Sequence, residues 1–529
     1  MRCPLLIAVA ALLMSTSGFP YLAAQTPPTI LWQFNYGGSM HDAGHCISPT
    51  SDGGYVIAGR TDSNDGDISG HHGLSDIWVI KLQGDGSMDW QRCYGGSEWE
   101  ENVAVIHATS DGGYIIGGST SSFDGDVECP GSNGPRIWLV KLESNGEIEW
   151  QRCLGGSGFD ILYSILTFED GFLICASSTS SDGDAVGNHG LSDMLLVKTD
   201  NAGNTIWSRC YGGSQSDGGL RVIASNAGGS IIVGQTSSND GDLVGNNPYY
   251  AEPVPSTTGW VMKVDAEGDI IWQRCVGGLG NEFLYDVKEA QDGSIWAVGY
   301  TNSNNGDVTG NQGGGDAWIV KLNGAGELIG TKCFGGTAHD RFGGINVLPS
   351  GNAIVVGRTI SADGDISDPL GGLDVWVVCV SSDLEVIWQR TMGGSTNDLA
   401  EGIAPASDGS VVITGYSQSS DGDLTGNHGE ADVWVVKLAP WEVGIAEHGT
   451  PQALHLYPSP VQDLLQVEWE GPHAAVLHWT IVDLTGRAVA QGRSAGGRWS
   501  VPVAHLAPGT YVMRVLTPEG LLAQRFMRG

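Results

Sequence analysis

Apolar and polar positions alternate in short runs along residues 30–438, and glycine-rich turns separate the runs, as is typical of β-strands. Four runs follow one another in "GHCISPT", "GYVIAGRT", "DIWVIKL" and "MDWQRCYGG". In the third run, Ile77 and Val79 lie on one face and Trp78 and Ile80 on the other. A strand that is apolar on both faces is covered on both faces. The pattern therefore predicts buried sheets packed against other sheets.

The four-strand unit recurs seven times, and this repeat decides the expected fold. The central glycine of a DGD-type tripeptide marks the units at Gly66, Gly125, Gly183, Gly241, Gly306, Gly364 and Gly422. The array begins with a lone strand, "ILWQFNYGG", and its seventh unit ends at "DVWVVKL" without a fourth strand. We expect the N-terminal strand to complete the last unit, because closing the ring removes free sheet edges. The sequence thus predicts an all-β chain, with a seven-bladed β-propeller of four strands per blade and a small β-sandwich after it.

The segments outside the repeats define the expected domains. Residues 1–24 are typical of a secretory signal peptide, with Arg2, an apolar run and a small-residue site before Gln25. The propeller is expected at 25–440, a linker at 441–452 and the sandwich at 453–529. No later segment is apolar over enough residues to predict a transmembrane helix.

Charge is distributed unevenly over these domains. The 529 residues have a formal charge of −35. Residues 451–529 contain six Arg, no Lys and five acids, so the other 55 acids and 18 bases beyond the signal peptide fall in 25–450, a formal −37. Such a charge argues against nucleic acid and anionic membranes as partners, because their phosphates would be repelled. It favours cations, basic partners or solubility alone.

Most repeated acids are predicted to lie on one face of the propeller. In a blade, the loop between the second and third strands shares a face with the crossover to the next blade, and these segments carry the DGD and GGS motifs. Together with an Asp that opens the third strand in five units, the repeated acids number 25. Every unit has an acid three residues after the GGS position, namely Asp42, Glu100, Asp160, Asp217, Glu282, Asp340 and Asp398. Such crowding is unfavourable unless solvent or cations screen the charges.

Three of the DGD loops have a spacing that resembles a calcium loop, with acids at positions 1, 3 and 12 and Gly at position 6. The candidate ligands are Asp65, Asp67, Asp76, Asp182, Asp184, Asp193, Asp421, Asp423 and Asp432. The loops depart from that pattern because position 2 is Gly, position 5 is never acidic and position 12 is the shorter Asp. The alternative is that these acids cap backbone N–H groups, which is the favoured interpretation for the acids after GGS. A catalytic acid–base pair is poorly supported, since seven near-identical copies do not make one asymmetric site.

Other repeated residues are interpreted as structural. His72, His189 and His428 lie in different blades, so hydrogen bonding within their loops is expected in preference to a zinc site. The recurring tryptophans are expected in the core, whereas Trp99 occurs once and is expected on the acidic rim. Five cysteines share one repeat position too far apart for a disulfide ladder, and we expect small buried apolar groups at Cys93, Cys153, Cys210, Cys275 and Cys333.

The repeat resembles the bacterial SBBP repeat, on the order D-x-x-V-x-K-L, a Gly turn, G-G-S-x-x-D and G-x-x-x-x-G-x-T over about residues 30–438. This resemblance implies a seven-bladed propeller but no single activity. The tail looks like the type A sorting domain of type IX secretion in Bacteroidota. The matching residues are Tyr457, Pro458, Pro460, Asp463, Asp483, Gly486, Arg487, Leu506, Gly509 and Tyr511. That second resemblance implies recognition of residues 453–529 by the type IX machinery, usual removal of the tail, and release or attachment at the cell surface.

Motifs of common enzyme classes are not found: the chain has no P-loop, GxSxG elbow, HExxH or paired CxxC. We therefore expect a secreted or cell-surface, non-enzymatic propeller that binds an extracellular protein or glycan, with Ca²⁺ as the one cofactor under consideration. The alternative is a propeller-type polysaccharide-degrading enzyme, which would need unique polar residues in a central pocket. Specificity is expected from the irregular rim elements: the insertion at 246–259 with Tyr249 and Tyr250, Trp99, and the loop at 127–136.

Overall fold

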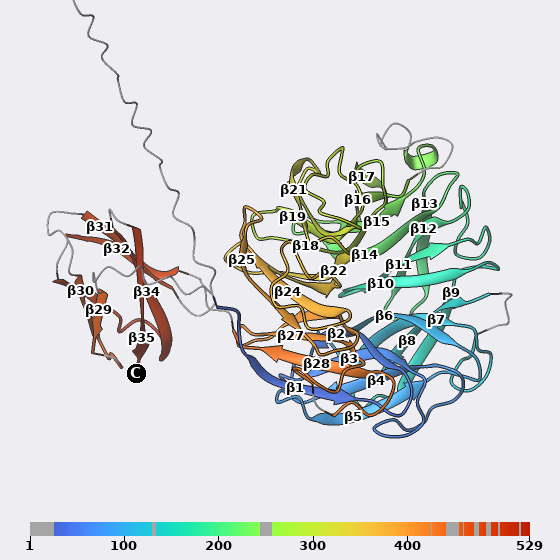
Figure 1. Ribbon diagram of the computed structural model, residues 1–529, viewed down its shortest axis with the longest axis horizontal. Helices are drawn as coiled ribbons and strands as arrows, with labels where there is room; N and C mark the ends of the chain where they lie inside the picture. Colours follow the sequence, from blue (N-terminus) through green and yellow to red (C-terminus); the bar gives the residue numbers. More distant parts are fainter. Residues whose placement is uncertain are drawn as a thin grey trace, which may run out of the picture.

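Seven four-stranded antiparallel sheets form a ring, and two further sheets, of three and four strands, follow them in the sequence (Figure 1). The structure is a computed structural model, in which the described part is residues 26–529 without 130–133, 244–255, 425, 441–453, 459, 470–475, 483–487, 496–497 and 518–519. Within that part the only helix is the short 3-10 turn η1 (Gly241–Leu243). The prediction of an all-β, seven-bladed propeller is confirmed.

Six blades take their four strands consecutively from the chain. The first three are β2 (Asp42–Pro49), β3 (Tyr55–Thr61), β4 (Asp76–Leu82), β5 (Met88–Tyr94); β6 (Glu100–Ala108), β7 (Tyr114–Thr120), β8 (Arg136–Leu142), β9 (Ile148–Leu154); and β10 (Asp160–Phe168), β11 (Gly171–Ser178), β12 (Asp193–Asp200), β13 (Thr205–Tyr211). The next three are β14 (Asp217–Ala224), β15 (Ser230–Thr236), β16 (Thr258–Val264), β17 (Ile270–Val276); β18 (Glu282–Glu289), β19 (Ile295–Thr301), β20 (Asp316–Leu322), β21 (Leu328–Phe334); and β22 (Asp340–Val347), β23 (Ala353–Thr359), β24 (Asp374–Val380), β25 (Val386–Met392).

The seventh blade joins the two ends of the array. It contains β26 (Asp398–Pro405), β27 (Val411–Ser417) and β28 (Asp432–Leu438), with β1 (Ile30–Tyr36) as its fourth strand. Strand β1 pairs antiparallel with β28, from Ile30 opposite Leu438 to Tyr36 opposite Val433. The expected closure of the ring by the N-terminal strand is confirmed.

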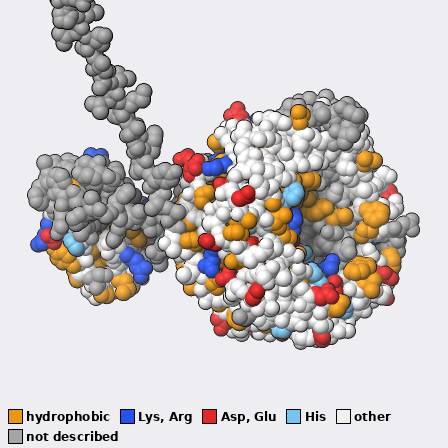
Figure 2. Space-filling model, in the orientation of Figure 1, with side chains coloured by type: hydrophobic (Ala, Val, Ile, Leu, Met, Phe, Trp, Pro, Cys, Tyr) orange, Lys and Arg blue, Asp and Glu red, His pale blue; other side chains and the backbone are white. Residues whose placement is uncertain are grey.

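The first strand of every blade lies innermost. Each first strand contacts the first strands of both neighbouring blades, and contacts between β2 and β26 complete the circle. Seven strands therefore surround the centre of the ring, where the space-filling view shows a hollow, called here the central channel (Figure 2). Side chains on these strands that face away from the blade packing are placed to line that channel.

The core consists of layers between adjacent blades, because both faces of each third strand are apolar. One such layer joins Ile77 and Val79 of the first blade to Ile116 and Trp138 of the second. The recurring tryptophans are buried as predicted, with Trp138 and Trp260 at 0% exposure. In five blades the Trp Nε1–H donates to a glutamine of the fourth strand, as in Trp138 to Gln151 at 2.7 Å. The recurring "WQR" sequence thus supplies a polar partner for a buried indole.

The tail forms a two-sheet sandwich. One sheet contains β29 (Leu454–Tyr457), β30 (Leu464–Trp469) and β33 (Arg498–Pro502), and the other β31 (Val476–Val482), β32 (Ala488–Ala495), β34 (Gly509–Thr517) and β35 (Gly520–Arg528). A single core joins Val467 and Val501 of the first sheet to Ile481 and Met513 of the second. The expected small β-sandwich is confirmed.

Candidate functional site

The acid after each GGS segment is a buried cap for the crossover between blades. Asp42 accepts hydrogen bonds from the backbone N–H of Gly38 at 2.8 Å, from Thr61 Oγ1 at 2.5 Å and from Ser63 Oγ at 2.9 Å. The equivalent acids of the other six blades accept from the same backbone position and from the same second strand. The capping role predicted for these seven acids is confirmed.

The DGD loop of each blade binds the crossover that enters the same blade. Asp65 Oδ1 accepts from the N–H of Ser39 at 2.7 Å, and Asp67 Oδ2 accepts from the N–H of Gly37 at 3.1 Å. The glycine between them is required, because Gly66 has a φ of +65° and a Cβ there would overlap the carbonyl oxygen of Gly37. All seven blades repeat both bonds, with Asn305 in place of the first acid in one blade.

The aspartate that opens the third strand faces the next blade. Asp193 Oδ1 and Asp217 Oδ2 lie 2.7 and 2.8 Å from the point that a Cβ on Gly212 would occupy, so these oxygens are at most 5.5 Å apart. The N–H of Gly212 donates to Asp242 at 3.1 Å, which brings a third carboxylate to the same junction. Carboxylates of successive blades thus gather around a glycine, where a larger residue would not fit.

One oxygen of each strand-opening aspartate is buried without a hydrogen-bond partner within the described structure. These atoms are Oδ1 of Asp76, Asp193, Asp316, Asp374 and Asp432, whose residues are at most 2% exposed. Burial raises the pKa of all five carboxyls, and carboxylates nearby add to the rise at four of them. The pKa of Asp316 reaches about 7, because burial is reinforced by Asp340 and Asp365.

The nine predicted calcium ligands are therefore divided between two kinds of site. Asp65, Asp67, Asp182, Asp184, Asp421 and Asp423 face the crossover that enters their own blade. Asp76, Asp193 and Asp432 face the junction with the following blade. The three acids of one loop do not converge, and among the described residues no three His, Cys, Asp or Glu side chains are grouped so that they could hold a metal ion.

The loop histidines bind the strand-opening aspartates. Nδ1 of His72, His189 and His428 lies 2.8, 2.6 and 2.7 Å from the aspartate four residues later. Burial lowers the pKa of His189, but the hydrogen bond and charge of Asp193 outweigh it and raise the pKa. The expected hydrogen bonding within these loops is confirmed.

Other sequence expectations have mixed outcomes. Trp99 is 40% exposed, as predicted for the rim. Tyr249, Tyr250 and most of the insertion lie outside the described residues, as do 130–133 of the other irregular loop. The expectation for Cys153 is wrong, because it forms a disulfide with Cys129 and ties that loop to β9. Cys153 has a partner because the irregular loop brings in a cysteine that no other repeat has.

The mouth of the channel on the acidic face differs from blade to blade. Glu401 on β26 lies 2.8 Å from His45 on β2 and 3.7 Å from Arg341 on β22. At the position of His45 and Glu401, other inner strands carry Tyr163 and Tyr285. Figure 2 shows a hollow at the centre of the ring with Lys, Arg and His side chains on its wall. This wall contrasts with the acidic loops around it.

Burial and charge set the ionisation of this cluster. Burial raises the pKa of Glu401, but the hydrogen bond with His45 and the charges of His45, Arg341 and Arg358 lower it to about 2. The pKa of Arg358 is lowered by burial and by Arg341. Glu401 is thus a negative charge among several positive groups; near neutral pH it has no proton to donate and is too weak a base to accept one.

Aromatic and charged side chains extend the mouth on either side. Arg60 pairs with Asp62 at 2.9 Å. The His41 ring lies 5.2 Å from that of Tyr416. On β18, the rings of Phe283 and Tyr285 stack at 6.2 Å.

Sequence reasoning missed these mouth residues because it followed the positions that repeat. These residues could have been found at the positions that do not repeat. Three residues after each capping acid, the side chain changes from His45 to Tyr163 to Glu401. Positions that vary within an otherwise uniform repeat are not needed to build or cap the blades. They are therefore the positions at which to look for specificity.

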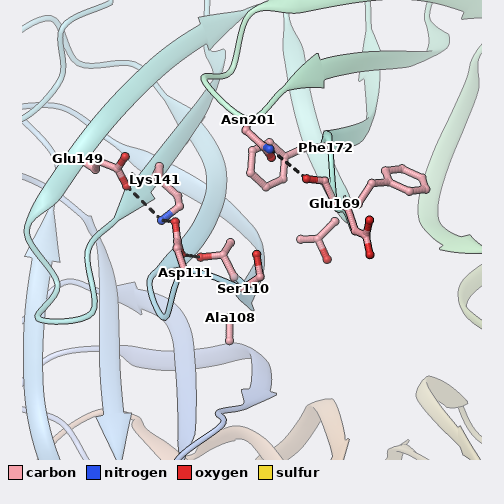
Figure 3. A pocket seen from close by; sticks show the side chains of 11 residues that line it. Ala108, Ser110, Asp111, Lys141, Glu149, Glu169, Phe172 and Asn201 are labelled. Atoms are coloured by element: carbon pink, nitrogen blue, oxygen red, sulfur yellow. Dashed lines mark hydrogen bonds and ion pairs between the residues drawn. The ribbon is translucent and has the colours of Figure 1, made fainter.

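A second hollow lies on the opposite face, between the second and third blades (Figure 3). It has a volume of about 690 Å³, and Lys141 lies in it between Asp111 at 2.9 Å and Glu149 at 3.2 Å. The Lys–Asp pair recurs in other blades, as in Lys81 with Asp52 at 2.8 Å. The polar groups of this hollow therefore largely belong to contacts that recur from blade to blade.

Comparisons with known proteins give weak likenesses for the repeats. A stretch of 199 residues, 35% of the chain, is 28% identical to the regulatory protein FlaEY of Caulobacter vibrioides, and covers 20% of that protein. Puromycin hydrolase is 12% identical over 87% of this chain and 62% of its own, with a TM-score of 0.42. The hemagglutinin-neuraminidase of Parainfluenza Virus 5 is 10% identical over 78% of this chain and 95% of its own, with a TM-score of 0.40. The chain thus spans less than two thirds of the first two relatives, and none of these likenesses bears on its activity.

The tail gives a specific match. Residues 455–527 match the family described as the secretion system C-terminal sorting domain. Among the described residues, no helix is long and apolar enough to cross a membrane. The C-terminal sandwich is a sorting domain of type IX secretion, and the protein is destined for the cell surface or the extracellular space.

Proposed function

We propose that the exported protein is a non-enzymatic binding protein whose ligand, an extracellular protein or glycan, contacts the mouth of the central channel on the acidic face. The observation that supports this is the contrast within that face. Seven blades repeat the same caps, whereas Arg341, Arg358, Glu401 and Tyr285 occupy positions whose side chains vary around the ring. A repeated frame around a varied, concave centre is the arrangement of a specific binding site.

The repeat family, the origin of the protein and its signal peptide are part of the same proposal. These are an SBBP-type repeat, an origin in Bacteroidota, and a signal peptide at 1–24, which lies outside the described residues. The type IX machinery is the partner implied by residues 455–527. An additional extracellular ligand is proposed from the mouth alone.

Calcium binding is proposed for the blade junctions. The strand-opening aspartate of one blade and the capping acid of the next share a junction, and one buried oxygen there has no hydrogen-bond partner in the described structure. Hard oxygen donors of this kind suit Ca²⁺, although a site would also need carbonyl or water ligands. Asp76, Asp193 and Asp432 take part in this arrangement, while the two acids of each tripeptide serve as caps.

A propeller-type polysaccharide-degrading enzyme is the second candidate. The mouth supplies the unique polar residues that such an enzyme would need, and the near-identity of the repeats does not extend to it. Against this, Glu401 is held ionised with a pKa of about 2. We therefore favour binding over turnover.

The deciding experiment uses the protein purified from culture medium, screened on glycan and peptide arrays, with hydrolysis of each hit followed by release of reducing ends or amines. We expect binding without turnover, weakened by Tyr285→Ala at the mouth. The matched control is Phe168→Ala in the hollow of the opposite face, which should leave binding unchanged. Turnover of a hit would establish the enzymatic alternative, and loss of binding only in Phe168→Ala would move the site to the other face.

A further inference from the structure

Arg341 and Arg358 lie directly opposite one another in the register of β22 and β23. Directly opposed residues share a face of the sheet, with Cβ atoms about 4.5–5.5 Å apart, and like charges at such positions are destabilising. Neither arginine recurs at these positions throughout the repeat: the equivalent pairs include Ala43 with Arg60 and Leu399 with Tyr416. The fold therefore does not require this pair.

The two guanidinium groups have few partners. Arg341 lies 3.7 Å from Glu401 and 4.9 Å from the ring centroid of Tyr285, distances too long for a direct hydrogen bond. Arg358 is partly buried, and no hydrogen bond or ion pair is found for it among the described residues. Each guanidinium can donate five hydrogen bonds in a planar fork that fits an oxyanion.

Glu401, the one ion-pair partner of Arg341 in the part of the chain that the structure describes, is already engaged. Glu401 accepts from His45 at 2.8 Å, so it does not neutralise both arginines. Among the charged mouth residues that the structure describes, histidines apart, Arg60, Arg341 and Arg358 exceed Asp62 and Glu401 by one positive charge. The centre of the face thus attracts an anion at short range.

The surrounding rim restricts what kind of anion can enter. Residues 25–450 carry a formal −37, and the exposed acids Asp65, Asp182 and Asp421 lie on this face. A polyanion would be repelled by that rim, whereas an isolated charge is screened beyond about 8–10 Å at physiological ionic strength. The combination selects one oxyanion on a ligand that is otherwise neutral.

We propose that Arg341 and Arg358 together bind a carboxylate or sulfate group carried by an otherwise neutral ligand. The proposal rests on the function proposed above and names the chemistry of the same site. Neither guanidinium group has a carboxylate within hydrogen-bond distance among the described residues, so an oxyanion of the ligand can accept hydrogen bonds from both. Binding then relieves the repulsion between them.

The test measures binding of methyl β-glucuronide, a 6-sulfated methyl glucoside and the neutral methyl glucoside by saturation-transfer NMR and calorimetry. We expect both or one of the anionic probes to bind, with about a tenfold or greater advantage over the neutral probe, as charged hydrogen bonds of this type provide. Preference for the glucuronide identifies a carboxylate, and preference for the sulfate ester identifies a sulfate. Equal binding of the neutral probe, or no binding of either anionic probe at millimolar concentration, would overturn the proposal.

Variants separate a ligand contact from a structural role. Arg341→Gln and Arg358→Gln should each lose about tenfold in affinity. Arg358→Gln should melt at or above the wild-type temperature, because a partly buried charge that lies opposite another arginine is removed. Arg92→Gln is the matched control and should leave affinity unchanged. Arg92 lies on the outer strand β5, away from the mouth, and pairs with Glu147 at 2.6 Å. If a ligand from the arrays is lost in Tyr285→Ala but kept in both arginine variants, the binding function stands and this inference fails.

Discussion

At the scale of single residues, one type of carboxyl group has different roles according to what surrounds it. Asp42 is buried but saturated by a backbone N–H and two hydroxyls. Asp316 is equally buried, yet its Oδ1 has no partner in the described structure and two carboxylates lie nearby. The first arrangement gives the carboxylate oxygens hydrogen-bond donors, whereas the second favours the protonated form of Asp316.

This difference predicts a pH dependence at Asp316. Its pKa in the folded state is about 7, above the unfolded value of 3.8, so the folded state binds more protons between those limits. Stability contributed by the protonated carboxyl is therefore lost as the pH rises from about 4 to 7. We expect Asp316→Asn to melt above wild type at pH 8 and level with it near pH 4, in chelator.

Asp383→Asn is the matched control for that prediction, because Asp383 is exposed on a turn and its removal should not change the melting temperature at either pH. Differential scanning calorimetry of the three proteins over this pH range measures the effect. A pH-independent difference between Asp316→Asn and wild type would show that Asp316 is ionised in the folded protein throughout.

At the scale of elements, the blades are held to one another by polar contacts at their rims as well as by apolar layers. The DGD loop caps one crossover, and the strand-opening aspartate reaches the next. The five blades whose third strand opens with Asp are thereby connected to both neighbours on the same face. A cation at the junctions would act on exactly these connections between elements.

Calcium is expected to stabilise the propeller if it neutralises the acid pairs, because binding to the folded state alone raises stability. We expect the melting temperature to fall on adding excess chelator and to recover with Ca²⁺, while Mg²⁺, which prefers smaller octahedral sites, restores less. Asp193→Asn should reduce the response by removing one junction. Melting curves that coincide in chelator and in Ca²⁺ would eliminate the proposal.

The disulfide between Cys129 and Cys153 predicts a second effect at this scale. It closes a segment with a sequence separation of 24 and joins the loop after β7 to β9. A covalent loop of that size contributes about 3 kcal/mol through the unfolded state. We expect the double variant Cys129→Ser, Cys153→Ser to lose about that much in urea unfolding.

Cys210→Ser provides the comparison for the disulfide, because Cys210 is a free thiol at the same repeat position as Cys153. Reductant should destabilise the wild type and leave the double variant unchanged. Labelling of both Cys129 and Cys153 by a thiol reagent in the folded, unreduced protein would contradict the assignment.

At the scale of the whole molecule, the fold could be predicted from the sequence because its determinants recur, whereas the candidate site lies where they do not. Seven copies of a strand such as "DIWVIKL" define the blades, and the offset between the ends of the array defines the closure. Sequence spacing shows only local neighbours, so it places Asp76 in one candidate calcium loop with Asp65 and Asp67. In the structure, the buried oxygen of Asp76 faces Gly95, at the crossover to the next blade. Arg341 and Arg358 are paired by the strand register next to a bulge, and neither arginine belongs to the repeated motif.

Ring closure depends on β1, and its removal is expected to affect the whole propeller. Without residues 26–36, the backbone groups of β28 from Val433 to Leu438 lose their partners, and Trp434 loses the side-chain carbonyl of Gln33. An unpaired edge of this kind favours pairing with another chain. We expect the truncated protein, expressed with residues 1–25 retained, to melt several degrees lower and to self-associate in light scattering. Phe34→Ala, which keeps the β1 backbone and removes a 39% exposed side chain, should stay monomeric with nearly unchanged melting. A truncated protein that is monomeric and melts with the wild type would mean that β1 contributes nothing to closing the ring.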